Sequence, residues 1–384
     1  FDLTGDQKTV LKGSYSQYYE GIFNDIYKRA TPGIEDRIQY DVSACDPFPA
    51  RCPDALRVET DRTTHPLYAI NPDIKHPRVD ETSLGFERAL SSDVRFSMTG
   101  IFRDSRNIIG SVNTDARWRP FTVTNGLEQP ITLYDWTNRD ESAESLLITN
   151  PDGFQFRDPS GAVLGAVSTE KKYKSLMFVL SKRLSHRWHG QVSYVLAKAY
   201  GSVNNTSEGS FGNNSSTNGG GGNRQFETPN ISFVNAQGEL TNSRRHELKA
   251  LLGVQVPKID VGINAYFRAF SGRPYQPYQQ FASSVLAFPP SSQGRRVLLE
   301  PRGSRRREAE KVLDLRVEKI FKIGSGRDRF SVYADVFNAL DASTVDGLQY
   351  RVPSLAIGDA DVAFDAPTSV VDPRQIVLGA RWSF

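Results

Sequence analysis

The connections between the predicted strands of this 384-residue chain alternate strictly between short and long. Ten segments alternate between apolar and polar side chains, a period of two that is typical of β-strands. These segments are residues 9–19, 82–90, 94–104, 173–184, 188–200, 246–257, 260–271, 312–322, 329–340 and 375–384. The short connections are 2–8, 91–93, 185–187, 257–259 and 324–328, and the long ones are 20–81, 105–172, 201–245, 272–311 and 341–374. In an antiparallel sheet, this order puts all the long connections at one end.

Each predicted strand has one apolar and one polar face. Residues 312–322, for example, place Leu313 and Leu315 on one face. Asp314 and Arg316 lie on the other. A soluble barrel with an apolar interior would satisfy the same alternation, so the sorting of the connections has to separate the two cases. Tight turns at one end and long loops at the other are typical of outer-membrane barrels, whereas a sandwich needs Greek-key crossings. The predicted fold is therefore all-β, a transmembrane antiparallel β-barrel with about ten strands in this chain.

Composition excludes two other classes of protein. Mean hydropathy is −0.45, and no run of eighteen or more apolar residues occurs, which argues against membrane-spanning helices. These values do not argue against a β-barrel, because only alternate residues of each strand face lipid. Lys and Arg total 47 against 44 Asp and Glu, a net charge of +3 that predicts no nucleic-acid surface.

The last predicted strand ends in an aromatic residue. Its apolar face carries Ile376, Leu378, Ala380, Trp382 and Phe384. This ending resembles that of bacterial outer-membrane proteins, whose assembly machinery recognises a last strand ending in Phe or Trp. The resemblance implies a C-terminal assembly signal at Leu378, Ala380, Trp382 and Phe384, the barrel assembly machinery as a partner, and an outer-membrane location.

Five phrases at the ends of the predicted strands resemble a known family when taken together. They are residues 71–78 (NPDIKHPR), 244–249 (RRHELK), 271–275 (SGRPY), 335–340 (DVFNAL) and 378–384 (LGARWSF). Their order and spacing are similar to those of TonB-dependent outer-membrane receptors, and closest to the Oar-like subgroup, which carries a carboxypeptidase-regulatory-like domain. The resemblance implies a 22-stranded barrel around an N-terminal plug, energised by a TonB-type protein.

The chain departs from that family pattern in length. It offers about ten strands and no segment that resembles a plug or a TonB box. We therefore expect residues 1–384 to be the C-terminal part of a larger barrel, with the five long connections as extracellular loops. A receptor split over two chains and a closed ten-stranded barrel are the alternatives.

The resemblance implies an active transporter or receptor that binds a substrate at the extracellular loops and passes it through the lumen. A passive pore and a surface adhesion or scaffold protein are the competing functions. The sequence does not name the substrate, since siderophores, oligopeptides, oligosaccharides and cobalamin-like molecules all use this architecture. We expect contact with outer-membrane lipid and lipopolysaccharide in each case.

Two cysteines, Cys45 and Cys52, stand close together in a proline-rich loop. Their spacing favours a small disulfide-closed loop in an oxidising compartment, with two free thiols as the alternative. No second Cys or His pair stands at zinc-ligand spacing, and no Ser-His-Asp or Cys-His set can be placed on one rim. We therefore predict no metal, no cofactor and no enzymatic activity.

A basic cluster precedes one predicted strand and consists of Arg302, Arg305, Arg306 and Arg307. It is a candidate contact for lipopolysaccharide phosphates or for an anionic substrate. A solvated flank paired with Glu308 and Glu310 is the alternative, and the sequence leaves both open. Aromatic residues of the long loops are candidates to line a ligand vestibule: Tyr68, Trp118, Tyr134, Trp136, Tyr275 and Tyr278.

Overall fold

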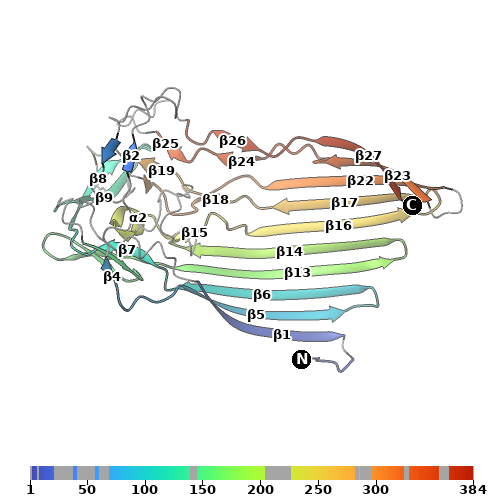
Figure 1. The fold of residues 1–384 in the computed structure, drawn as a ribbon, viewed down its shortest axis with the longest axis horizontal. Coiled ribbons are helices and arrows are strands. Elements are labelled where there is room, and N and C mark those ends of the chain that lie inside the picture. Colours follow the sequence, from blue (N-terminus) through green and yellow to red (C-terminus); the bar gives the residue numbers. More distant parts are fainter. Residues whose placement is uncertain are drawn as a thin grey trace.

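One antiparallel sheet dominates the computed structural model (Figure 1). The structure describes residues 2–6, 8–20, 38–40, 57–59, 69–138, 145–203, 226–281, 285, 296–323, 328–353 and 363–383. The ten long strands, in their order across the sheet, are β1 (Thr9–Tyr19), β5 (Arg78–Ala89), β6 (Val94–Arg106), β13 (Lys171–Ser185), β14 (Trp188–Gly201), β16 (His246–Val256), β17 (Val261–Phe270), β22 (Glu310–Ile323), β23 (Asp328–Phe337) and β27 (Gln375–Ser383). An eleventh, β15 (Gly238–Glu239), pairs with the end of β14. The structure confirms all ten predicted strands.

The short connections lie together at what we call the turn end of the sheet. Those that the structure describes join β5 to β6, β13 to β14, and β16 to β17 (Figure 1). Between β13 and β14 only His186 and Arg187 remain, with φ values of 50° and 69°. Positive φ at both central residues is the backbone of a type I′ hairpin turn, whose twist matches that of the flanking strands. Serine hydroxyls of Ser185 and Ser91 donate to Asp93 in the adjacent turn and hold the pKa of that carboxyl well below its usual range.

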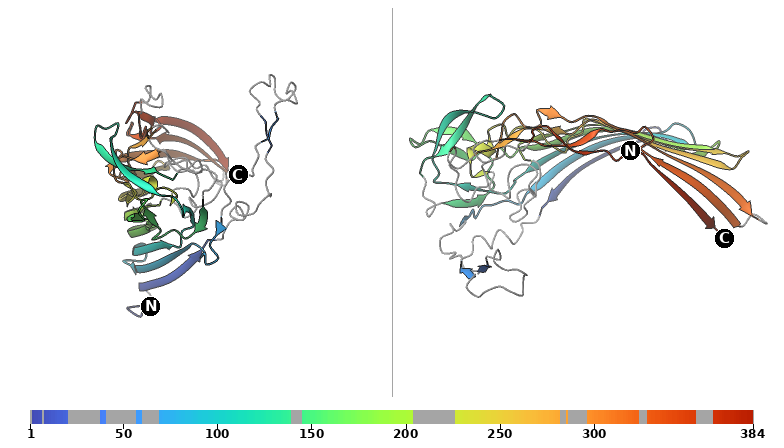
Figure 2. Two further views of the ribbon diagram at one scale, coloured as in Figure 1. Left: turned by 90° about the vertical axis from the view of Figure 1, so that its left-hand side faces the viewer. Right: turned by 90° about the horizontal axis from the view of Figure 1, so that it is seen from above.

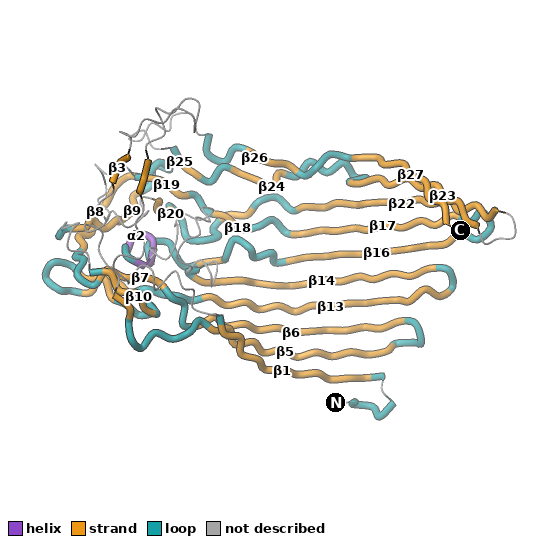
Figure 3. Tube along the Cα trace, in the orientation of Figure 1, coloured by secondary structure: helices purple, strands orange, loops and turns teal. Residues whose placement is uncertain are grey.

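The long connections gather at the opposite end, the loop end, where they form several small sheets (Figures 1 and 3). The paired sets are β4 (Ala69–Ile70), β10 (Leu146–Thr149) and β7 (Gly110–Asn113); β8 (Trp118–Thr124) and β9 (Pro130–Trp136); β11 (Gln155–Arg157) and β12 (Val163–Ala166); β18 (Pro274–Tyr275) and β21 (Arg305–Arg306); β20 (Arg296–Leu298), β19 (Tyr278–Gln280) and β25 (Arg351–Val352); β24 (Val345–Leu348) and β26 (Pro367–Val370); and β2 (Ile38–Tyr40) and β3 (Arg57–Glu59).

A short helix, α2 (Pro229–Ser232), also belongs to the loop end. Thr228 caps its N-terminus by accepting a hydrogen bond from the backbone N–H of Asn230, and Pro229 occupies a first-turn position where a missing N–H costs nothing. Within the described part of the chain, no helix has the length and apolar character that crossing a membrane requires.

The apolar cores lie in the loops rather than on the sheet. The largest cluster joins residues from several connections: Ile108, Val112, Ala116, Trp118, Trp136, Phe156, Val167, Val203 and Phe226. A second cluster, around Leu133 and Val297, ties the β8–β9 hairpin to β20. Among the described residues, the ten long strands contribute no member to these clusters. The loop end therefore folds as a small packed unit with its own interior.

The two faces of the sheet differ as the alternation predicts. The register places Leu84, Gly100 and Leu176 side by side across β5, β6 and β13. This apolar face, defined by Leu84, Leu176 and Leu378, is bare: Leu84 is 64% exposed and Leu378 is 78% exposed. An uncovered apolar area of this extent is unusual for a protein in water and expected for one in lipid.

The opposite face, defined by Glu81, Arg316 and Asp335, is the charged face. Near the loop end it is covered, because Ala199 and Val312 on this face are only 7% and 1% exposed. The long connections thus fold over the charged face and leave the apolar face free.

The sheet is an open, curved wall (Figure 2). Among the described strands, β1 and β27 form its two edges and do not pair with each other. The alternative of a ten-stranded barrel closed by these strands is therefore wrong for this structure.

A charge placed on the apolar face tests its contact with lipid. Leu315→Arg, near the middle of β22, is expected to destabilise the protein by about 2–4 kcal/mol, because a guanidinium at mid-bilayer depth loses its hydration. Gln191→Arg on the charged face is the matched control and is expected to change stability by less than about 1 kcal/mol. Urea unfolding in phospholipid vesicles measures both variants. Equal losses for the two would contradict the assignment of the faces.

Candidate functional site: the charged face and the loop end

Cross-strand ion pairs line the charged face. Arg316 binds Asp335 with two hydrogen bonds of 2.7 and 2.9 Å between β22 and β23. Lys12 contacts Glu87 at 2.7 Å between β1 and β5, and Arg103 pairs with Glu81 between β6 and β5. Pairs this exposed contribute only about 0–1 kcal/mol each, so they contribute little to stability. Their main consequence is a polar, hydrated surface on this side of the wall.

A buried carboxylate joins two of the loops above this wall. Glu239, only 6% exposed, accepts hydrogen bonds from Arg245 at 2.8 Å, from Ser243 at 2.7 Å and from Arg306. Burial opposes ionisation and acts to raise the pKa of Glu239. The three donors outweigh that effect and hold the pKa below its usual range. Because Arg306 belongs to β21, this one side chain connects the segments before β16 and before β22.

The predicted basic cluster does not form one exposed patch. Arg302 is buried and donates to the backbone carbonyls of Ala236 and Ser202, at 2.8 and 3.0 Å. Arg305 pairs with Glu300 at 2.6 Å, and its hydrogen bonds lower the pKa of that carboxyl. The carboxylate partners are thus Glu300 and, for Arg306, Glu239 rather than the expected Glu308 and Glu310. Since three of the four guanidinium groups already have partners, lipopolysaccharide contact by this cluster stays a prediction.

Arg307, the fourth member, lines a small polar cavity of about 110 Å³. Its guanidinium lies 5.3 Å from the ring centre of Tyr350, and its buried Nε has no hydrogen-bond partner within the described residues. Burial is the largest influence on the pKa of Arg307, and together with the charges of Arg273 and Arg244 it lowers that pKa. The lining of this cavity has mixed charge, with three arginines and three acidic residues. The cavity is lined by Arg244, Gly272, Arg273, Arg307, Glu308, Glu310, Thr344, Val345 and Asp346.

The aromatic residues expected to line a vestibule are mostly inside the loop cores. Trp118 and Trp136 are directly opposite each other in the β8–β9 hairpin and are 0% and 3% exposed. The prediction is wrong for these two residues. Tyr275 is also buried, stacks on Tyr350 and donates a hydrogen bond to Asp365 at 2.9 Å.

The other candidate residues have different outcomes. Cys45, Cys52 and Tyr68 lie outside the described residues, as does Phe384. Trp382 lies on the apolar face and packs edge-on against Phe330 of β23, with ring centres 6.2 Å apart. Its role with Leu378 and Ala380 in assembly stays a prediction. Over the part of the chain that the structure describes, no three His, Cys, Asp or Glu residues are placed to hold a metal ion.

A family model described as an outer membrane beta barrel domain matches residues 1–293, about three quarters of the chain. The chain belongs to this outer membrane β-barrel family. Its location is therefore the bacterial outer membrane, where the bare apolar face has lipid to contact. A comparison with curated proteins finds no match.

Solved structures show the same fold at low sequence identity. The outer membrane transporter YddB from Escherichia coli overlaps 99% of this chain, with a TM-score of 0.53 and 10% identity. Only 39% of that transporter is covered, so the chain spans well under half of its length. The FpvAI–pyocin S2 complex, with a TM-score of 0.47 and 10% identity over 100% of this chain and 32% of that one, overlaps less well. The ferripyoverdine receptor of Pseudomonas aeruginosa also overlaps less well, with a TM-score of 0.42 and 11% identity. The overlap covers 81% of this chain and 28% of that receptor.

The buried carboxylate of this outer membrane β-barrel can be tested by pH. Glu239→Gln is expected to destabilise the loop end by about 1–3 kcal/mol at pH 7, because Arg245 and Arg306 lose a charged acceptor. Since folding lowers the pKa of Glu239, its stabilisation is present above the ordinary Glu pKa of about 4.3 and is lost as pH falls toward the lowered value. The difference between wild type and variant should therefore shrink below about pH 4.

Hydrogen exchange of the loop amides measures this difference, and the exposed Glu128→Gln serves as the control. A pH-independent gap between wild type and Glu239→Gln would contradict the ionised state.

Proposed function

We propose that this outer membrane β-barrel forms part of the wall and the extracellular loops of a TonB-dependent type of transporter. The observation that carries the proposal is the charged face, which is lined by ion pairs and covered at one end by folded loops. A solute that binds at the loops would move along this face. The fold shared with an outer membrane transporter and the five family-like phrases support the proposal.

The edges of the sheet support the assignment to a larger barrel. In hydrocarbon, an unpaired strand edge leaves backbone N–H and C=O groups without partners, which costs several kcal/mol per group. The described strands leave β1 and β27 as edges, so we infer that further strands complete the wall in the membrane. These belong either to the same polypeptide or to a second chain. That remaining part would then carry the plug and bind the TonB-type partner.

The loops favour a receptor over a passive pore. A pore needs an open entrance, whereas these connections pack around buried Trp118 and Phe226 and cover the charged face. The cavity at Arg307 adds a place where a carboxylate or phosphate group of a ligand fits beside an incompletely bonded guanidinium.

The test compares energised uptake with passive flow. Cells that produce the protein are grown on ferric chelates, oligopeptides or oligosaccharides as limiting nutrients, with and without the TonB-type protein. We expect growth on one class to require both proteins, and the purified complete barrel, with the strands that close it, to give no steady conductance in a planar bilayer. Steady conductance together with uptake in the absence of the TonB-type protein would establish a passive pore instead.

A variant of Arg307 tests whether the cavity binds the transported ligand. Arg307→Gln is expected to raise the nutrient concentration for half-maximal growth by roughly tenfold, because one charge-assisted hydrogen bond to the ligand is lost. Arg119→Gln, on an exposed part of the β8–β9 hairpin, is the matched control and should not change it. If both variants had the same nutrient concentration for half-maximal growth, Arg307 would not be part of the binding site.

A further inference from the structure

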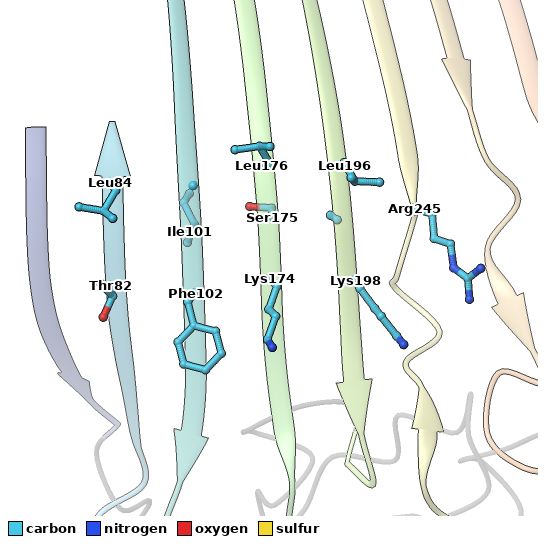
Figure 4. A pocket seen from close by; sticks show the side chains of 12 residues that line it. Thr82, Leu84, Ile101, Phe102, Lys174, Ser175, Leu176, Leu196, Lys198 and Arg245 are labelled. Carbon is cyan, nitrogen blue, oxygen red and sulfur yellow. The ribbon is translucent and has the colours of Figure 1, made fainter. Parts of the chain in front are cut away.

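Two lysines on the apolar face have no carboxylate partner among the described residues. Lys174 of β13 and Lys198 of β14 are directly opposite each other in the register, with both side chains at the loop end of the apolar face (Figure 4). Like charges in directly opposed positions are destabilising unless an anion compensates them. Lys174 lies 5.5 Å from the ring centre of Phe102, and Lys198 lies 5.3 Å from that of Tyr200. These aromatic contacts offset the repulsion only in part.

Neighbouring cations on the same side of the sheet are paired. Arg78 and Arg106 both contact Asp80, at 3.4 and 3.2 Å. Lys172 contacts Glu170 at 2.7 Å. Among the described residues of β5, β6, β13 and β14, the loop end of the apolar face therefore leaves Lys174 and Lys198 without a carboxylate. Lys311 of β22 also has no ion pair among the described residues, but it has no second lysine opposite it.

An apolar groove begins at the two lysines and extends along the strands away from the loop end (Figure 4). It has a volume of about 670 Å³, and its lining includes Leu84, Gly100, Leu176 and Leu196 (Figure 4). Gly100 is the reason for the groove, because the register puts it between Leu84 and Leu176, where the row of side chains on β5, β6 and β13 is interrupted. The groove opens on the face that contacts lipid.

The position of the lysines fixes the kind of occupant. In barrels of this family the long loops are extracellular, so the loop end lies at the outer leaflet. A molecule that fits both features needs an apolar chain for the groove and an anionic group for the lysines. Basic pockets at the headgroup level of a membrane bind anionic lipid headgroups in this way.

We propose that this groove is a specific site for a phosphorylated glycolipid of the outer leaflet. One acyl chain lies over Gly100 between Leu84 and Leu176, and a phosphate group lies between Lys174 and Lys198. Arg245, just before β16, lines the same groove and shares the carboxylate of Glu239 with Arg306. The site depends on the orientation in the membrane and not on transport, so it stands or falls separately from the proposed function.

The first experiment tests the phosphate contact. The intact protein is purified in mild detergent, freed of native lipid and titrated with bis-phosphorylated lipid A, with the bound lipid counted by native mass spectrometry. The double variant Lys174→Gln/Lys198→Gln is expected to weaken binding about 10- to 30-fold, because each lysine near the headgroup contributes roughly fivefold. Lys311→Gln, on the same face near the loop end of β22, is the matched control and should bind as wild type does.

The second experiment tests the groove. A Cβ on Gly100 would have its nearest neighbours, on Leu176, Leu84 and Ser175, at 4.0 Å, so Gly100→Leu fills the groove without forcing a backbone shift. We expect this variant to bind lipid A at least fivefold more weakly. Gly262→Leu on the charged face, with its nearest atom also at 4.0 Å, is the control.

Three results would overturn the proposal. If the wild type bound dephosphorylated lipid A as tightly as the phosphorylated form, the proposed phosphate contact would be wrong. If Gly100→Leu bound lipid A as the wild type does, the proposed position of the acyl chain in the groove would be wrong. A self-association that persists without lipid and is lost in the double lysine variant would make this face a protein interface instead.

Discussion

The constraint on which the structure depends is the absence of water in the bilayer core. Every backbone N–H and C=O of a membrane-spanning strand needs a partner in a neighbouring strand. The ten long strands meet this requirement by continuous antiparallel pairing from β1 to β27. Pairing also fixes which side of each strand contacts lipid, since a slip of one residue would exchange the two faces. The two-residue turn at His186 and Arg187, together with a one-residue register shift between Lys182 and Ser185, sets that register for β13 and β14.

A wall that gives its apolar side to lipid cannot use those residues for a core. The loop end compensates by building a core of its own from distant connections. Gly110 illustrates how closely these connections pack, because a Cβ at that position would overlap the ring of Phe226. Phe226 is buried in the same cluster as Trp118, so residues more than a hundred positions apart define one interior. The sheet thus depends on lateral hydrogen bonds and lipid, whereas the loop end depends on ordinary apolar packing.

The sequence was sufficient for the strands because their signal is local. Alternation with a period of two is visible within ten residues, and all ten strands follow it. Even the pair of Lys174 and Lys198 was within reach, since both are twelve positions from His186 in the predicted turn. The contacts of Glu239 were not, because Arg306 reaches it through the folding of two separate loops. For the same reason the run from Arg302 to Arg307 resembled a patch in sequence, while in space its members have separate partners.

Charge compensation separates the two sides of this wall. On the charged face, cations such as Lys12 and Arg316 obtain a carboxylate from an adjacent strand of the same sheet. On the apolar face, Lys174 and Lys198 have only aromatic neighbours within the described part of the chain. What distinguishes Lys174 and Lys198 is that they are directly opposed and have no carboxylate among the described residues. The proposed lipid site places the missing anion in the membrane for this reason. On a face with few charged residues, a lysine without a carboxylate partner therefore points to an anion supplied from outside the protein.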